Sequence, residues 1–305
     1  MSNKIINFHD VRDINWFEKT ILILKNKYKL ISIEDLDNFF YNGKELNNCC
    51  HITIDDGDKT FYDIIYPVLK KHKIPATLYV SSKICTNSEN FWFQEMRGFN
   101  ELNIKEIIAL HYNIDKKTIV PYSSGSILKN CRIDDIVNII KQYKMQFGVD
   151  SKAPQNMTNE QLKEIDKDGL VVIGAHTLNH PILKNETAER SKVEIVDSIN
   201  ELAEILNHEI KYFAYPNGIP FLDFDEREFE YLKSKNIRLA FSTESNNFSK
   251  GNNPLSIPRF GISFGNHYFV KTKLLLGKNW DLIKNLKSKG EKQTRLEIKK
   301  ELKLE

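Results

Sequence analysis

Short apolar runs recur along the chain, and they constrain its fold more than any other feature. Seven of them have the composition of buried β-strands, at residues 4–8, 51–54, 76–81, 170–173, 212–215, 237–241 and 255–258. Helical patterns separate most of these runs. Between the second and third, apolar residues recur at spacings of three and four, which predicts one buried helix face. A strand-helix-strand unit of this kind implies parallel strands.

Local signals place further helices between the later runs. Thr158 and Gln161 form a capping-box pattern, and Gly169 stands where a left-handed stop is expected, so a helix is predicted over 159–168. A second amphipathic helix is predicted over 193–206. Residues 86–157 interrupt the alternation and contain helical patterns at 105–111 and 133–147. We interpret 86–157 as an insertion in a single catalytic domain, residues 1–286, followed by a charged C-terminal tail, residues 287–305.

Composition excludes several classes of protein. In 305 residues, 41% are hydrophobic and 28% charged, which argues against disorder and against a membrane span. The net charge of +3 is too small to indicate a broad basic face, so no nucleic-acid partner is expected. The four cysteines show no C-x-x-C spacing, and the N-terminus has no signal-peptide pattern. We therefore expect a cytoplasmic protein; the oligomeric state stays open.

Two adjacent carboxylates, Asp55 and Asp56, follow the run at 51–54 and precede Gly57. Neighbouring carboxylates repel each other, and such a pair is tolerated chiefly when a cation or a proton neutralises one of them. His176 and His180 follow the run at 170–173 at i, i+4 spacing. By itself this histidine pair is a weak motif, and a plain surface or core pair is the alternative.

The two motifs gain weight together because the carboxyl ends of parallel strands share one face of a sheet. Two imidazoles, one carboxylate and an open fourth position are the pattern of a catalytic zinc site. The remaining carboxylate could then act as a general base toward water. The sequence therefore indicates metal-assisted hydrolysis of an amide or ester.

Three motifs, Thr53-Ile54-Asp55-Asp56-Gly57-Asp58, His176-Thr177-x-x-His180 and Phe213-Ala214-Tyr215-Pro216-Asn217-Gly218, resemble the signatures of polysaccharide deacetylases, the carbohydrate esterase family with a nodulation-type deacetylase domain. The resemblance implies a distorted (β/α) barrel of about seven parallel strands, with the insertion between the third strand and the His-x-x-x-His strand. It implies metal-dependent removal of N-acetyl groups from an amino sugar or an N-acetylated glycan precursor.

The same resemblance implies residue roles. Asp55 is then the base, and Asp56, His176 and His180 hold one divalent ion, expected to be Zn²⁺. Asn217 lends a backbone N–H to the developing oxyanion.

Two departures from the family pattern affect the site. Many members carry an Arg in the third motif, where this chain has Ala214, and Arg259 is the expected substitute that keeps Asp55 ionised. A plain surface Arg is the alternative for Arg259. The late motif that supplies a general acid is not recognisable; His267, the only downstream histidine, is interpreted as a helix start. His9 borders the pocket or is a structural histidine.

Two other functions stay open. An amidohydrolase that acts on a small non-sugar amide could use the same metal site, and only the aromatic run Phe91-Trp92-Phe93, a candidate sugar platform, argues for sugars. A carbohydrate-binding protein that has lost turnover is supported by the missing acid motif and by Ala214. Against it stand a complete ligand set and an intact base.

Overall fold

The computed structural model describes residues 2–277, 279 and 290–304. Its eight strands form one sheet in the order β7-β6-β5-β4-β3-β1-β8, and the short β2 also pairs with β3. Every pairing between these strands is parallel. The strands are β1 Lys4–Phe8, β2 Lys29–Leu30, β3 Cys49–Ile54, β4 Ala76–Val80, β5 Val171–Ala175, β6 Tyr212–Ala214, β7 Leu239–Phe241 and β8 Phe260–Gly261.

The segment 254–261 connects the two edges of the curled sheet. Ala240 and Ser242, in and next to β7, donate backbone hydrogen bonds to Pro254 (2.8 Å) and Ile257 (2.9 Å). Shortly afterwards, β8 pairs with β1. The expected strand at 255–258 is therefore replaced by a single bridge to β7, because the chain changes neighbours around Pro258, which has no N–H to donate. The expected distorted (β/α) barrel of parallel strands is confirmed.

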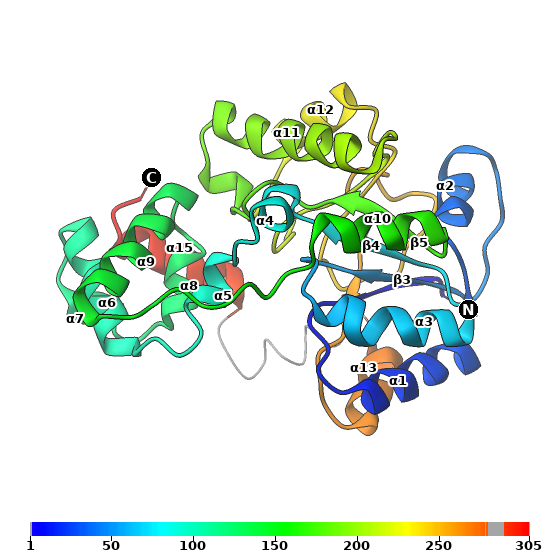
Figure 1. Cartoon of the computed structure of the whole chain (residues 1–305), viewed down its shortest axis with the longest axis horizontal. Coiled ribbons are helices and arrows are strands. Elements are labelled where there is room, and N and C mark those ends of the chain that lie inside the picture. Colours follow the sequence, from blue (N-terminus) through cyan, green and yellow to red (C-terminus); the bar gives the residue numbers. More distant parts are fainter. Residues whose placement is uncertain (1, 278, 280–289, 305) are drawn as a thin grey trace.

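Helices surround the outside of the sheet (Figure 1). The π-helical turn η1 runs directly into α3, a departure from the single helix predicted between β3 and β4. The helix predicted over 159–168 is confirmed as α10. The elements of this layer are α1 Ile14–Lys27, α2 Ile33–Tyr41, η1 Phe61–Ile65, α3 Tyr66–His72, α4 Ser82–Asn87, α10 Asn159–Asp168, η2 Leu183–Asn185, α11 Ala188–Leu206, α12 Glu226–Ser234 and α13 His267–Leu276.

Apolar side chains fill both faces of the sheet. One cluster lies between the strands and the surrounding helices and includes Phe17, Leu69 and Leu202. A second cluster fills the barrel interior and includes Tyr79 and Phe241. β1, β3 and β4 are buried along their whole length, so their polar side chains are buried too, and two of them, His51 and Thr77, are hydrogen-bonded to each other at 2.9 Å. None of the described helices is both long and apolar enough to cross a membrane.

The insertion forms a helical lobe beside the barrel (Figure 1). It has a hydrophobic cluster of its own, to which Ile104, Ile108, Ile136 and Ile139 contribute. The helix predicted over 133–147 is confirmed as α9. The helices of the lobe are α5 Trp92–Glu95, α6 Glu101–Tyr112, α7 Lys116–Ile119, α8 Ser124–Leu128 and α9 Ile133–Phe147.

The C-terminal helix α15, Glu291–Glu301, packs into this lobe, and Ile298 and Leu302 are buried in its cluster. Arg295 of α15 is 1% exposed; it pairs with Asp223 next to the barrel and donates to the carbonyl of Lys129 in the lobe (3.0 Å). The sequence analysis expected a charged tail here; residues 287–289 lie outside the described residues. The division into one domain and a tail stays a prediction.

Candidate metal centre and active site

Asp55 and Asp56 lie at the carboxyl end of β3, and the backbone N–H of Asp55 continues the sheet by donating to Phe8 of β1 (3.0 Å). Asp56 has a φ of 77° and Gly57 a φ of 78°, both in the left-handed region. A Cβ on Gly57 would also lie 3.0 Å from a Val80 methyl, so glycine suits this turn. Left-handed backbone at a non-glycine residue is strained and is common at functional sites.

His176 and His180 face Asp56 from the loop after β5. The Nε2 atoms of both imidazoles lie 3.4 Å from Asp56 Oδ1. One ligand atom from each of the three residues lies within 4.8 Å of the other two, and all three residues are buried. The residues that the sequence grouped as metal ligands are therefore brought together by the fold.

The hydrogen bonds of these groups fit a divalent ion. Asp56 Oδ1 and His180 Nδ1 are buried without a hydrogen-bond partner among the described residues, whereas His176 Nδ1 contacts the carbonyl of Ala214 at 2.7 Å. That contact leaves His176 Nε2 free to face Asp56, the arrangement expected of a metal-binding histidine. An unpaired buried carboxylate oxygen is costly, and a cation would compensate it.

Burial and charge set the protonation of this cluster. Burial lowers the pKa of His180 to about 4, so its imidazole is neutral and able to bind a metal. Burial alone would raise the pKa of Asp56, but the neighbouring imidazoles, His176 first, hold it well below its ordinary value. Asp56 is therefore an anion. The donor set of one carboxylate and two imidazoles suits zinc.

Glu194 of α11 holds the loop that carries the two histidines. Its buried carboxylate accepts hydrogen bonds from the backbone N–H groups of Leu178 (3.1 Å) and Asn179 (2.9 Å) and from the Asn179 side chain (2.7 Å). Thr177 and His180 in this loop have positive φ values of 65° and 57°. Sequence reasoning missed Glu194, because no spacing links it to the histidines.

Arg259 lies inside the barrel with no exposed surface and pairs with Asp55 through two parallel hydrogen bonds, of 2.8 Å to Oδ1 and 2.9 Å to Oδ2. Its Nε donates to the carbonyl of Ser242 (3.0 Å), and Asn7 of β1 adds a bond of 2.8 Å to Asp55 Oδ2. Burial raises the pKa of Asp55, but the Arg259 guanidinium outweighs this and holds it below its usual range. The contact expected between Arg259 and Asp55 is present; the surface alternative does not hold.

Asn217 follows β6, the strand that contacts His176 through Ala214. Its φ is 56°, and its side-chain Nδ2 is buried without a hydrogen-bond partner among the described residues. Its carbonyl accepts a hydrogen bond from the Thr243 hydroxyl, which fixes the turn. Tyr215 of the same motif belongs to the core, where it stacks on Phe224 with ring centroids 3.6 Å apart.

His9 lies at the end of β1, at the mouth of the site. Its Nε2 is 4.0 Å from Asp55 Oδ2, and its side chain is 50% exposed. The sequence analysis left open whether His9 borders the pocket, and the structure places it there. His267, by contrast, is the first residue of α13 and packs near Trp16, as expected of a helix start.

The aromatic run of the insertion lies against the metal ligands and not in an open platform. Phe91 and Trp92 are buried, the Trp92 indole N–H donates to the His180 carbonyl (3.2 Å), and Phe91 and Phe93 meet the His180 ring edge-on. The run thus connects the insertion to the site by packing. A sugar platform at these residues is not supported, because two of the three rings are covered.

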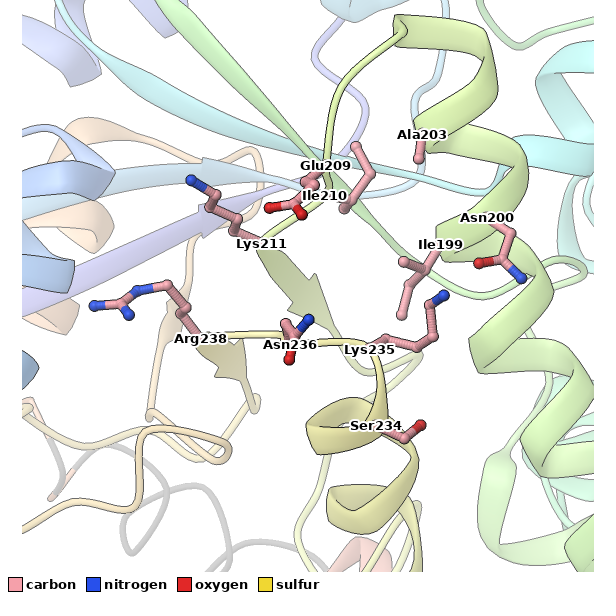
Figure 2. Close-up of a pocket in the computed structure, with 10 residues that line it drawn as sticks. All are labelled: Ile199, Asn200, Ala203, Glu209, Ile210, Lys211, Ser234, Lys235, Asn236 and Arg238. Carbon is pink, nitrogen blue, oxygen red and sulfur yellow. The ribbon is translucent and has the colours of Figure 1, made fainter.

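A cavity of about 450 Å³ lies elsewhere on the barrel, and Figure 2 shows the residues that line it. It includes Lys211 and Arg238, which precede β6 and β7 and so lie at the amino ends of the strands. The metal cluster lies at the carboxyl ends. This cavity therefore belongs to the opposite end of the barrel from the candidate site.

A family model described as polysaccharide deacetylase matches residues 42–110 and 114–240. The chain therefore belongs to the polysaccharide deacetylase family, as the three sequence motifs predicted. The matched region includes both strands that carry the metal cluster.

Named relatives fall within the same family. The chain is 23% identical over 256 residues to the poly-β-1,6-N-acetyl-D-glucosamine N-deacetylase of Staphylococcus aureus. The aligned region covers 81% of this chain and 66% of the length of that protein. Among solved structures, IcaB from Ammonifex degensii gives a TM-score of 0.58 at 17% identity over 86% of this chain and 92% of that one. The Streptococcus pyogenes deacetylase PplD, in complex with acetate, gives a TM-score of 0.56 at 18% identity over 86% of this chain and 92% of that one. At such identities the structural likeness shows the fold.

Proposed function

We propose that this protein is a zinc-dependent N-deacetylase that releases acetate from an N-acetylated glycan or glycan precursor in surface polysaccharide or glycoconjugate metabolism. One observation carries the proposal: an ionised carboxylate, Asp55, stands directly beside the buried cluster of Asp56, His176 and His180. The cluster provides a place for a divalent ion, and Asp55 provides a base next to it. The family and the Staphylococcus aureus relative support the choice of an N-acetylated glycan.

Asp56, His176 and His180 would hold the ion. When bound, a zinc ion polarises an amide carbonyl and lowers the pKa of water toward about 7. Glu194 keeps both imidazoles aimed at Asp56 by fixing the loop between them. The Ala214 carbonyl fixes the ring orientation of His176.

Asp55 would take the proton from the attacking water. Arg259 keeps this carboxylate ionised and oriented, so Arg259 is a positioning residue. Asn217 would donate its backbone N–H to the oxygen that becomes negative as water adds to the acetyl carbon, and one such donor contributes about 3 kcal/mol to catalysis. The carbon–nitrogen bond then breaks, and the products are acetate and a free amine on the sugar.

His9 is our candidate for the group that protonates the leaving nitrogen. It lies 4.0 Å from Asp55 on the solvent side, and its side chain is half exposed. An imidazolium can donate a proton near neutral pH. In this arrangement Asp55 takes a proton and His9 returns one, so the two steps do not depend on the same carboxylate.

The central test is acetate release from N-acetylglucosamine oligomers by zinc-loaded protein. Asp55→Asn should retain stoichiometric zinc and lose at least a hundredfold in kcat, while His176→Ala should lose the metal. The matched control is His208→Ala, because His208 is exposed and its contacts, with Asp166 and with the carbonyl of Glu209, lie on the surface. Stoichiometric zinc in the His176→Ala protein would refute the ligand assignment.

Two rival functions give different results. A binding protein without turnover would bind the oligomers tightly and release no acetate. An amidohydrolase for small amides would hydrolyse a simple N-acetylated amine as fast as any glycan. The cytoplasmic location also stays a proposal; its support is that all four cysteines are buried and free, and cell fractionation tests it.

A further inference from the structure

A small basic cavity lies where the C-terminal helix, the insertion and the loop after His180 meet. Its volume is about 350 Å³, and its walls come from the start of α9, from η2 and from the end of α15. Figure 1 shows α15 beside α9 in the helical lobe. The cavity shares no residue with the metal cluster or with the cavity in Figure 2. Its volume is at the lower end of the range for small-molecule sites and suits a ligand as large as one substituted sugar unit.

Positive charge predominates in this cavity. The cationic side chains of its wall are Arg132, Lys184, Lys299 and Lys303. The wall also holds one carboxylate, Asp135, which already contacts His111 (3.1 Å) and Tyr112 (3.2 Å). Lys184 pairs with Asp225, whereas the other three cations form no ion pair with any described residue. The cavity therefore has an excess of positive charge.

Lys299 lies closest to the other positive charges of this region. Burial lowers the pKa of Lys299, and the charges of Arg295 and Lys184 lower it further. Arg295 is buried one turn earlier on α15, where it pairs with Asp223. An anion in the cavity would offset this repulsion, because Lys299 has no carboxylate partner of its own among the described residues.

Two amides in the wall of the cavity lack a hydrogen-bond donor. Nδ2 of Asn130 donates to the carbonyl of Ser126 (2.8 Å), and Nδ2 of Asn185 donates to the carbonyls of Lys129 (3.0 Å) and Cys131 (3.2 Å). These bonds fix the orientation of both amides. Oδ1 of each is buried without a hydrogen-bond partner among the described residues. A buried acceptor without a donor is costly, and a hydroxyl group of a ligand would compensate it.

We propose that this cavity binds a small phosphate monoester that carries hydroxyl groups, such as a sugar phosphate. The phosphate contacts Arg132, Lys299 and Lys303, and the hydroxyl groups donate to Asn130 and Asn185. A bare anion would leave both amide oxygens unpaired, and a neutral sugar would leave the three cations unpaired. The site is separate from the metal cluster, so it does not depend on the proposed deacetylase function.

The shape of the site favours a small molecule over a macromolecule. Three separate segments form a concave wall, and the cations lie together in one cavity. A membrane surface is bound by an exposed apolar face with basic residues around it. Nucleic acid is bound by a basic patch or stripe along a face, and the net charge of +3 is too small to indicate one.

The test is calorimetric titration of the full zinc-loaded chain with glucose 6-phosphate, methyl phosphate and glucose. Glucose 6-phosphate should bind about tenfold more tightly than methyl phosphate, because its hydroxyl groups add two hydrogen bonds. Glucose should not bind measurably, because it lacks the phosphate. Equal Kd values for glucose 6-phosphate and methyl phosphate would overturn the proposal, and so would the absence of binding of glucose 6-phosphate at millimolar concentration.

Variants of two segments locate the binding. Lys299→Met and Arg132→Met should each raise the Kd of glucose 6-phosphate about tenfold, since each removes a hydrogen bond to a charged group. The matched control is Lys300→Met, which should change the Kd by less than about twofold. Lys300 is exposed in the same last turn of α15 and does not line the cavity. If these lysines served only the helix dipole, Lys299 and Lys300 would be equivalent.

Arg132→Met keeps the test valid if Lys299→Met does not fold. Arg132 is exposed, and its side chain makes no capping hydrogen bond at the start of α9, so its urea midpoint should equal that of wild type. Binding of glucose 6-phosphate that is unchanged in Arg132→Met lies elsewhere, for example at the zinc ion, and would overturn the proposal.

Vesicles of anionic phospholipid and a single-stranded oligonucleotide separate the sources of phosphate. Wild type and Arg132→Met should bind both of them equally weakly. Binding of the vesicles or of the oligonucleotide that Arg132→Met abolishes, without any binding of glucose 6-phosphate, would assign these cations to a lipid surface or to nucleic acid and overturn the proposal.

Discussion

Replacing Arg259 by Met should destabilise the protein strongly, because Asp55 would remain as a buried charge without its cation. The side chains of Arg259 and Asp55 are 0% and 3% exposed, so solvent does not screen the pair. Removal of one partner from such a buried pair costs about 3–5 kcal/mol. Arg259→Lys keeps the charge but loses the two parallel bonds, so its loss should be smaller.

Urea-induced unfolding of chelator-treated protein at pH 7 measures this loss, and Lys233→Met is the matched control. Lys233 also pairs with a carboxylate, Glu230, but both side chains are well exposed, at 60% and 70%. Solvent screens that pair, and its loss should cost less than about 1 kcal/mol. A double variant with Asp55→Asn should recover much of the loss, because the unpaired charge is then removed.

The sign of the pH dependence follows from the lowered pKa of Asp55. In the folded protein this carboxyl ionises below its unfolded value of about 3.9, so the pair contributes its full stability above that pH and loses it as the pH falls through the folded pKa. The difference between wild type and Arg259→Met should therefore be largest near neutral pH and shrink below about pH 4. A loss no greater than that of Lys233→Met would refute the reasoning.

Three more predictions concern charge and metal. Burial raises the pKa of Glu186 to about 7. The free energy of unfolding should therefore fall by about 3 kcal/mol as the pH rises from about 4.5 to 7. Glu186→Gln should remove this fall from urea midpoints measured across that pH range. In chelator-treated protein, Asp56→Asn should lower the midpoint, because the lowered pKa of Asp56 means that its charge stabilises the fold at neutral pH. Zinc at a hundred times its Kd should stabilise only wild type, by about 2.7 kcal/mol in a thermal shift. Arg295→Met should lower the free energy of unfolding by about 3–5 kcal/mol, because it leaves Asp223 buried without its cation, and an unchanged urea midpoint would contradict that contact.

The elements that could be predicted are those specified by local signals. The helices at 133–147 and 159–168 have the predicted bounds, because their caps and apolar faces lie within the segments themselves. β8 was misplaced by a few residues, because its position depends on which neighbour the chain pairs with after Pro258. The packing of α15 was not foreseen, because its charged sequence gives no sign that Ile298 and Leu302 are buried in the insertion.

In the candidate site, too, some contacts could be predicted from the sequence and others could not. The grouping of Asp56 with His176 and His180 followed from one rule, that the carboxyl ends of parallel strands meet, and the three residues do meet. The contacts of Glu194 and of Asn7 could not be predicted, because a hydrogen bond between distant segments produces no recognisable spacing in the sequence. The aromatic run in the insertion shows the opposite error: its composition suggested a platform, whereas packing against His180 explains it.

The two adjacent carboxylates that first indicated a site have separate electrostatic environments. Asp55 receives two hydrogen bonds from a guanidinium and one from an amide, so its charge is matched by a full cation. Asp56 faces two imidazoles, one with a pKa lowered to about 4, and its Oδ1 has no hydrogen-bond partner among the described residues. Asp56 raises the pKa of the other imidazole, His176, so in the metal-free protein a proton on His176 offsets part of the Asp56 charge. The left-handed backbone at Asp56 is strained, and a bound divalent ion would replace that proton and match the carboxylate charge.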